Sequence, residues 1–346
     1  MAPLGAPIAQ RAVAGEAAFD LTSLPDGAAL VTGDRGGGVS LTLLDHAGGQ
    51  RDQPLSLSGS QDGSVVEVAA ASDGSRLALA WTLRLKTGPR ASSFVLGDAA
   101  TRSFSAPLSL GETSADGEQT GAIAVTATED GGFVALRRGL DEPCSEDPSR
   151  HCVGYAFREL SATAVESRGL PMAVPVPCAR IIAGLVVAEG RWHYGFCSQA
   201  EGRPVTTHFM RQLAPFFVEV HRSFEGCTPV GATVVAGDAL FAADCPDGRR
   251  GVRVGAMGVK LRSLRLWQSE VICERGSPVI KIPGDAPVEI VLKEPRAGLS
   301  VLLPPRLAPG NTKAVWTGTT LLSAAWVAGE VAVRRYECSG SELVAR

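Results

Sequence analysis

Two pairs of cysteines repeat at a fixed interval along this chain. Cys178 and Cys197 are 19 residues apart, and Cys227 and Cys245 are 18 residues apart. The second pair follows the first after 49 residues, counted between the first members of the two pairs. A chain that places the same covalent bridge twice at one interval is expected to consist of copies of one structural unit. The spacing therefore predicts a repeat fold in which each copy contacts its neighbours.

Turn sequences that contain Gly, usually beside Asp, recur at a comparable interval, and each precedes an apolar segment. An Asp-Gly turn supplies the positive φ and the local hydrogen bonds that a tight β-hairpin needs. The turns lie at residues 24–27, 71–74, 128–131, 188–190, 236–238, 283–285 and 316–318. The sequence Pro-Leu-Ser-Leu at 54–57 is repeated at 107–110, which supports the same period. Units of roughly 40–50 residues are typical of four-stranded blades, so the sequence predicts a β-propeller with seven such blades, with six or eight as alternatives.

The composition agrees with an all-β chain that forms a single propeller domain over residues 1–346. Glycine occurs 40 times and proline 22 times, and these residues separate many short apolar runs. Such runs are typical of strands, whereas helical periodicity is hard to find. A propeller must close into a ring, because otherwise two sheet edges stay exposed. We expect a strand at about residues 5–14 to complete the last blade, with residues 343–346 as the competing candidate.

The Pro-Asp-Gly turn at 25–27 and the Ser-Asp-Gly turn at 72–74, each before an apolar strand, resemble the repeats of WD40-like and TolB-type bacterial β-propellers. The resemblance lies mainly within residues 20–140. It implies a ring of repeated blades, and it implies no particular substrate.

The eight cysteines are even in number and form no CxxC motif, which favours disulfides over a zinc site. The predicted bridges are Cys144–Cys152, Cys178–Cys197, Cys227–Cys245 and, as the pair that remains, Cys273–Cys338. The second and third of these would each join the first and second strands of one blade at the same rim. Residues 271–276 are similar to 336–340, which would place Cys273 on a third strand of its blade rather than on a first.

Disulfides are typical of oxidising compartments, so we expect an extracytoplasmic protein that is periplasmic, secreted or anchored to the outer membrane as a lipoprotein. The first residues lack a basic start and an apolar segment, so this expectation includes a targeting segment absent from the chain. No run of 18 apolar residues occurs, and no membrane insertion is expected. The alternative is a cytosolic protein with eight buried thiols.

The net charge of −3 does not favour nucleic acid or an anionic membrane as a partner. The loops between the second and third predicted strands nevertheless carry cations in six of seven blades, while the opposite rim carries Asp or Glu. Charges sorted in this way can steer a partner. We therefore expect an anionic ligand or an acidic protein surface to dock on the cationic rim, with ordinary solvated loops as the alternative. The candidate binding residues are Arg84, Lys86, Arg90, Arg137, Arg138, Arg150, His151, Arg203, Arg249 and Arg250.

Sequence signatures of catalysis and of cofactor binding are missing. The chain has no HxH or HExxH spacing for a metal, no GxSxG nucleophile turn and no GK[ST] phosphate loop. No metal, cofactor or catalytic residue is therefore predicted. His193 alternates with Trp192 and Tyr194 on an apolar strand, and we expect it to pack in the core.

These observations predict an exported, non-enzymatic binding or scaffold propeller at the bacterial cell envelope, whose partner is another envelope protein or an anionic glycan. The alternative is a propeller-type glycan hydrolase or lyase. Two carboxylates that face each other across the channel mouth, one with a raised pKa, would favour the enzyme. A channel lined by small apolar residues would favour the binding module.

Overall fold

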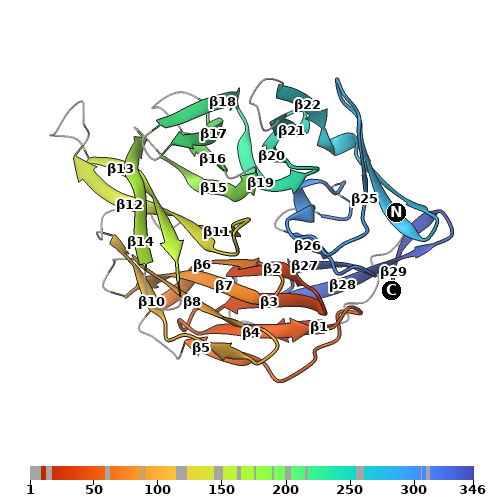
Figure 1. Cartoon of the computed structure of the whole chain (residues 1–346), viewed down its shortest axis with the longest axis horizontal. Coiled ribbons are helices and arrows are strands. Elements are labelled where there is room, and N and C mark those ends of the chain that lie inside the picture. The colour runs from red at the N-terminus through yellow and green to blue at the C-terminus, as the bar shows by residue number, and fades with distance from the viewer. Residues whose placement is uncertain are drawn as a thin grey trace.

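The computed structural model shows strands arranged around a central axis (Figure 1). The structure describes residues 9–12, 18–58, 63–86, 88, 90–113, 123–143, 151–161, 165–174, 177–188, 191–198, 204–214, 217–254, 261–304, 306–308 and 312–346. For residues 9–12 and 261–262, and for many residues between 137 and 222, only the backbone is described. Regular structure in these ranges is β-strand apart from two three-residue 3-10 helices, so the all-β prediction is confirmed. Neither of these helices is long enough to span a membrane.

Within the described residues, five blades are built from consecutive antiparallel strands. The first blade comprises β2 (Ala18–Leu24), β3 (Gly27–Gly33), β4 (Val39–Leu44) and β5 (Leu55–Ser58). The second comprises β6 (Gly63–Ser72), β7 (Arg76–Leu85), β8 (Arg90–Asp98), β9 (Ser103–Phe104) and β10 (Leu108–Thr113). The third comprises β11 (Ile123–Ala127), β12 (Phe133–Pro143), β13 (His151–Leu160) and β14 (Val165–Val174). The fourth comprises β15 (Pro177–Ala188), β16 (Arg191–Ser198), β17 (Thr206–Ala214) and β18 (Phe217–Glu225). The fifth comprises β19 (Thr228–Val235), β20 (Asp238–Cys245), β21 (Gly248–Val254) and β22 (Leu261–Arg265).

Two further sheets in the described part of the chain depart from this pattern. After η1 (Leu266–Gln268), a three-stranded sheet contains β23 (Glu270–Glu274), β24 (Ser277–Ile282) and β25 (Val288–Val291). The last sheet contains β26 (Lys313–Trp316), β27 (Leu321–Val327), β28 (Glu330–Ser339), β29 (Glu342–Ala345) and, from the other end of the chain, β1 (Ala9–Ala12). The prediction of seven equal four-stranded blades is therefore wrong, because only five blades of consecutive strands precede these two irregular sheets.

The inner strands form a closed circle. Strand β2 contacts β6, β6 contacts β11, β11 contacts β15, and β15 contacts β19. Between β19 and β26 the inner position is taken by η2 (Leu299–Val301), which contacts both strands, and β26 in turn contacts β2. A ring of sheets around a channel is the architecture of a β-propeller, as predicted. Pro295 and Pro304 flank η2, and prolines lack the N–H that a strand ladder needs, which disfavours an inner strand at this place.

Apolar side chains fill the spaces between neighbouring blades. Trp81 packs against the first blade, and Phe94 packs against the third. Between the fourth and fifth blades the rings of Phe209 and Phe241 are stacked, with centroids 4.7 Å apart. His193 is buried as predicted, with its ring 6.3 Å from that of Phe241. Burial of each large side chain contributes roughly 2–3 kcal/mol, so the faces of the sheets, and not their edges, hold the ring together.

Both ends of the chain complete the last sheet. Strand β1 pairs with residues 330–333 of β28, and β29 pairs with residues 336–339 of the same strand. The two candidates for the closing strand therefore share one edge, and each covers about half of it. The ring is closed partly by β1, which pairs a segment from early in the chain with the last sheet.

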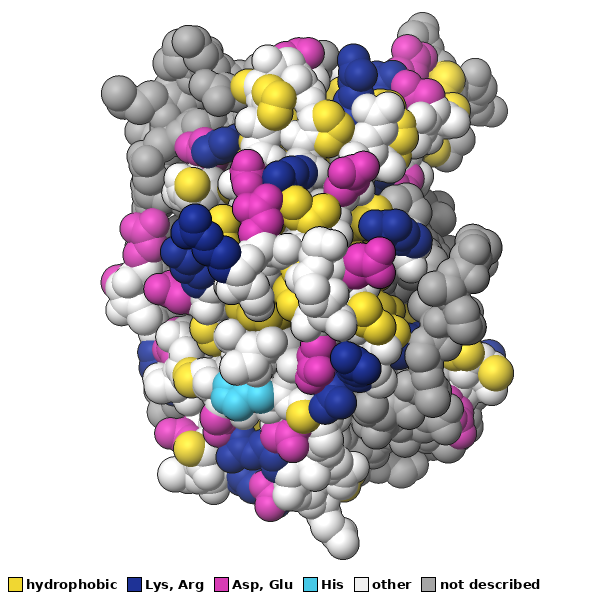
Figure 2. Space-filling model, turned by 90° about the vertical axis from the view of Figure 1, so that its right-hand side faces the viewer, with side chains coloured by type: hydrophobic (Ala, Val, Ile, Leu, Met, Phe, Trp, Pro, Cys, Tyr) yellow, Lys and Arg dark blue, Asp and Glu magenta, His cyan; other side chains and the backbone are white. Residues whose placement is uncertain are grey.

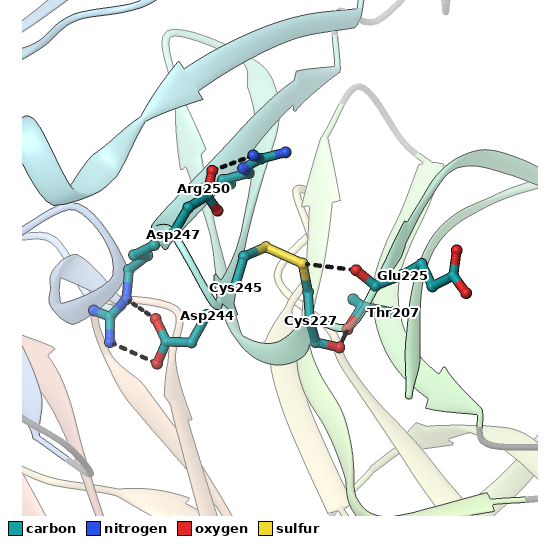
Figure 3. Close-up of a disulfide and its surroundings, with 8 residues drawn as sticks. Thr207, Glu225, Cys227, Asp244, Cys245, Asp247 and Arg250 are labelled. Carbon is teal, nitrogen blue, oxygen red and sulfur yellow. Dashed lines mark hydrogen bonds and ion pairs between the residues drawn. A yellow bond between two sulfur atoms is a disulfide. The ribbon is translucent and has the colours of Figure 1, made fainter. Parts of the chain in front are cut away.

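Two disulfides are confirmed, and they connect different parts of the ring. Cys227 immediately precedes β19 and Cys245 ends β20, so this bridge joins the first two strands of the fifth blade at one rim (Figure 3). The second bridge joins Cys273 on β23 to Cys338 on β28, with Cα atoms 5.6 Å apart. Strand β23 contacts β29, and the N–H of Cys273 donates a hydrogen bond to the carbonyl oxygen of Ser341 at 3.0 Å. The three-stranded sheet is thus fastened covalently to the last sheet.

The other predicted bridges fall outside what the structure describes. Cys144 lies in the segment 144–150, which is not described, and Cys152 is described only by its backbone. Cys178 and Cys197 lie on the paired strands β15 and β16, where Pro177 is opposite Ser198, but their side chains are not described. These two bridges remain predictions.

Candidate functional site

One hairpin of the predicted cationic rim lies as expected. Arg84 lies near the end of β7, Lys86 follows that strand, and Arg90 begins β8, so all three belong to the hairpin between the second and third strands of the second blade. Arg84 and Lys86 are exposed, and Arg90 is half-buried. We call this hairpin, residues 84–90, the cationic hairpin.

The structure places the cations of the fifth blade differently from the prediction. Arg249 is buried, with 7 % of its surface exposed, and its Nε lies 2.8 Å from Oδ1 of Asp244. It also donates a hydrogen bond to the carbonyl oxygen of Ser300 at 3.3 Å. Arg250 forms an ion pair with Asp247, visible in Figure 3 beside the disulfide. Both cations therefore form ion pairs within their own hairpin, Arg249 in a buried position and Arg250 in a partly exposed one, and their role in binding a ligand stays a prediction.

The remaining rim candidates are not brought together in the described residues. Arg137 and Arg138 lie inside β12, opposite Ala156 and Tyr155 of β13, and therefore not in the loop that follows the strand. His151 begins β13, where only the backbone is described. Arg150 and Arg203 lie outside the described residues.

The acidic turns of the opposite rim also carry their own counter-ions. The ion pairs are Asp26 with Arg51, Asp73 with Arg76, and Asp238 with Arg253. The side of the molecule in Figure 2 likewise shows basic and acidic side chains interspersed. Local pairing of this kind reduces the separation of charge between the two rims that the sequence suggested.

A cavity of about 570 Å³ lies at the centre of the ring. Its described lining comes from β2, β6, β11, β19, β26 and the segment around η2. Many of these side chains are small, among them Ala69, Ala71, Ala124, Ala232 and Ala297. The charged residues of the described lining are Asp20, Glu67, Arg296 and Lys313. Small side chains leave room for a ligand, and the few charged groups are the ones that would orient it.

Three of these charged residues form a belt across neighbouring inner strands. The Nζ atom of Lys313 on β26 lies 3.4 Å from Oδ1 of Asp20 on β2. The other oxygen of Asp20 accepts a hydrogen bond from the N–H of Ala70 on β6 at 2.9 Å. Oε2 of Glu67 on β6 accepts a hydrogen bond from the N–H of Ile123 on β11 at 3.1 Å. We call Lys313, Asp20 and Glu67 the channel belt, because each side chain reaches from one blade to the next.

A β-bulge places Glu67 in this belt. Along β6, Val65 is opposite Leu83 and Glu67 is opposite Thr82, so Val66 is the extra residue. Bulges bend a strand and re-aim the side chains beside them, and they are frequent next to functional sites. Here the bulge lies directly before the acid and leaves Val66 exposed at 36 %.

The carboxyl group of Glu67 holds its proton much more tightly than an ordinary glutamate. Burial raises its pKa to about 8, because the carboxylate would lose most of its hydration inside the ring. The hydrogen bond from Ile123 and the positive charges of Lys313 and Arg90 lower the pKa, but by less than burial raises it. Although the side chain is partly accessible from the channel, protein surrounds it, so burial dominates. Glu67 is therefore largely protonated at neutral pH.

Asp20, Glu67 and Lys313 were not among the candidates chosen from the sequence. Glu67 interrupts the apolar run Val65–Ala71, and Asp20 lies between Phe19 and Leu21, both of which are buried. An acid inside an apolar inner strand is costly to bury, and this was the signal that could have singled out both residues.

Comparison with known proteins gives only distant structural likenesses. No family model and no curated protein matches the sequence. Several solved structures are similar to the chain at low identity, and two of those named here are described as β-propeller domains. The β-propeller domain of the trilobed protease from Pyrococcus furiosus is 10 % identical over 94 % of this chain and 97 % of that one, with a TM-score of 0.49. The β-propeller domain of Cps50 (Swd1) from Myceliophteria thermophila is 10 % identical over 93 % and 98 %, with a TM-score of 0.43. An α-L-arabinofuranosidase from Clostridium thermocellum is 9 % identical over 71 % and 93 %, with a TM-score of 0.40.

Proposed function

We propose that this chain is an extracytoplasmic, non-enzymatic binding propeller that takes an anionic ligand into its channel at the channel belt. The ligand is an anionic glycan or an acidic segment of another envelope protein. The cationic hairpin belongs to the same blade as Glu67, and the positive charge of Arg90 lowers the pKa of the Glu67 carboxyl. Arg84, Lys86 and Arg90 thus keep the role that the sequence suggested for them.

The balance of charge in the described channel lining carries this proposal. Lys313 contributes one positive charge and Asp20, 3.4 Å from it, one negative charge, whereas Glu67 is mostly uncharged at neutral pH because its pKa is about 8. Arg296 then leaves the described lining with a net positive charge. A positive charge inside a narrow, protein-walled channel attracts anions more strongly than the same charge on an open surface.

The engagement of the two acids favours binding over catalysis. Both oxygens of Asp20 are occupied, one by Lys313 and the N–H of Leu21 and the other by the N–H of Ala70. One oxygen of Glu67 accepts the N–H of Ile123. These groups link neighbouring blades, whereas the acids of a hydrolase must be directed at the bond that they cleave.

A glycan hydrolase or lyase is the second candidate, and one observation favours it. Glu67 combines a raised pKa with a second carboxylate, Asp20, in the same cavity. Glycoside hydrolysis uses two carboxyl groups, one of which keeps its proton at neutral pH so that it can act as the general acid. In that role Glu67 would be the general acid.

The two confirmed disulfides support the extracytoplasmic part of the proposal, since disulfides persist in oxidising compartments.

The test compares an oligogalacturonate with its neutral methyl ester, so that the two ligands differ mainly in charge. We expect the acid to bind and the ester to bind at least tenfold more weakly. Lys313→Met and Arg296→Gln should each weaken binding of the acid, while Lys293→Met, a change at an exposed lysine outside the described lining, should not. Equal binding of acid and ester would refute the proposal. Mass spectrometry of the same mixtures detects cleavage, and cleavage that Glu67→Gln abolishes would establish the enzyme instead.

A further inference from the structure

The two oxygens of the Glu67 carboxyl group have different surroundings. Oε2 accepts the N–H of Ile123, which fixes the orientation of the group. For Oε1 the described residues provide no hydrogen-bond partner, although the side chain lines the cavity and is partly exposed to it. A protonated carboxyl has one O–H donor besides its acceptor capacity. If the proton is on Oε1, Glu67 presents a donor to the channel.

The charged groups around Glu67 come from three other strands. Lys313 projects from β26, Arg90 begins β8, and Asp20 lies on β2, and all three act on the Glu67 carboxyl through their charge. Strand β11 contributes only the N–H of Ile123. An oxyanion beside Lys313 would add a negative charge to this cluster. An ionised Glu67 would repel that anion, whereas a protonated Glu67 would donate a hydrogen bond to it.

We infer that an oxyanion held in the channel by Lys313 accepts a hydrogen bond from the protonated carboxyl of Glu67, so that binding is coupled to the uptake of a proton. This inference rests on the proposed function and specifies the ligand chemistry and the regulation of the same site. The ligand group is a carboxylate or a sulfate, as an acidic glycan carries. Binding is strong when Glu67 is protonated and weakens as the medium becomes alkaline.

The protonation behaviour of the free protein sets the size of the effect. Because burial raises the pKa of Glu67 to about 8, the carboxyl loses its proton just above neutral pH. A ligand that binds only the protonated form is weakened by the fraction of protein in that form. We therefore expect binding to weaken about tenfold between pH 7 and pH 9.

Isothermal titration calorimetry tests the coupling with inorganic sulfate and trigalacturonate, which keep their charge over this pH range. Titrations at pH 8.5 in two buffers of different ionisation enthalpy report the protons taken up. We expect roughly three quarters of a proton per bound anion, the fraction of Glu67 that is ionised at that pH. Use of both probes separates a site for any small oxyanion from a site for the acidic sugar.

Variants make the assignment specific to Glu67. Glu67→Gln keeps a hydrogen-bond donor and an acceptor but cannot titrate, so it should bind the anion with no proton uptake and no loss of affinity up to pH 9. Glu129→Gln changes an exposed acid in the turn between β11 and β12 and should behave like the original protein. Wild-type binding without pH dependence or proton uptake would overturn the inference and leave the proposed function standing. Proton uptake that persists in Glu67→Gln would overturn it as well. Failure of both probes to bind at pH 6.5 would overturn the inference and the proposed function together.

Discussion

Replacing Glu67 by Gln should stabilise the protein at alkaline pH. Burial raises the pKa of Glu67 from 4.5 to about 8 in the folded protein, so the folded state holds this proton more tightly than the unfolded chain does. The stabilisation from the protonated carboxyl is complete below pH 4.5 and is lost progressively as the pH rises to about 8. Each pH unit in that window changes the free energy of unfolding by about 1.4 kcal/mol. The original protein should therefore lose about 4 kcal/mol between pH 5 and pH 9 that the Gln variant keeps.

Urea unfolding at pH 5, 7 and 9 measures this difference directly. The two proteins should have similar free energies of unfolding at pH 5 and should diverge steadily toward pH 9. Glu129→Gln, the exposed control, should follow the original protein at every pH. Parallel pH profiles for the original protein and Glu67→Gln would show that water in the channel solvates the carboxylate, and the reasoning from burial would then be incorrect.

Four other changes test the fold and the contacts that fasten it. The bridge Cys227–Cys245 closes a loop with a sequence separation of 18, and the bridge Cys273–Cys338 closes one of 65. In the chain-entropy model, replacing the first pair by Ser should lower the free energy of unfolding by about 3 kcal/mol, and replacing the second pair by Ser should lower it by about 4 kcal/mol. Urea titration measures both, and a larger loss at the shorter loop would contradict that model. Arg249→Ala should cost about 2 kcal/mol, because the buried side chain serves both Asp244 and the carbonyl of Ser300. An unchanged urea midpoint would show that this ion pair is dispensable. Deletion of residues 1–17 should lower the melting temperature yet leave a folded protein whose elution volume is unchanged, because β29 still pairs with half of β28. Circular dichroism and gel filtration check this, and complete unfolding would mean that β1 alone closes the ring.

The features that the sequence predicted well are local ones. The bridge between Cys227 and Cys245 followed from one turn, because a hairpin centred on 236–237 brings the residues before β19 and at the end of β20 to the same rim. That turn has positive φ at both Ala236 and Gly237, the geometry of a tight hairpin. A hairpin is determined by a few adjacent residues, so its register can be inferred without knowledge of the rest of the chain.

The irregular part of the ring could not be inferred in this way. Strand β23 has a pattern like that of β28, and the similarity of residues 271–276 to 336–340 was visible in the sequence. The pattern did not indicate that the chain would then pass inward and fill an inner position with η2. That outcome depends on the space left between β19 and β26, which is set by the five blades that precede it and by the closure of the ring. A repeat pattern predicts where copies begin, but it does not predict what replaces a missing strand.

The same distinction between local and long-range contacts explains the functional residues. Asp244 lies opposite Arg249 in one hairpin, and Asp247 is three residues from Arg250, so these acids and bases neutralise each other wherever the hairpin lies. A count of cations along predicted loops overlooks that cancellation. The charges of the described channel lining come from β2, β6, β26 and the segment around η2, and the contact between β26 and β2 that brings Lys313 to Asp20 exists because the ring closes. The proposed anion site therefore depends on ring closure, and a variant that opens the ring without unfolding the blades should lose anion binding while its local ion pairs persist.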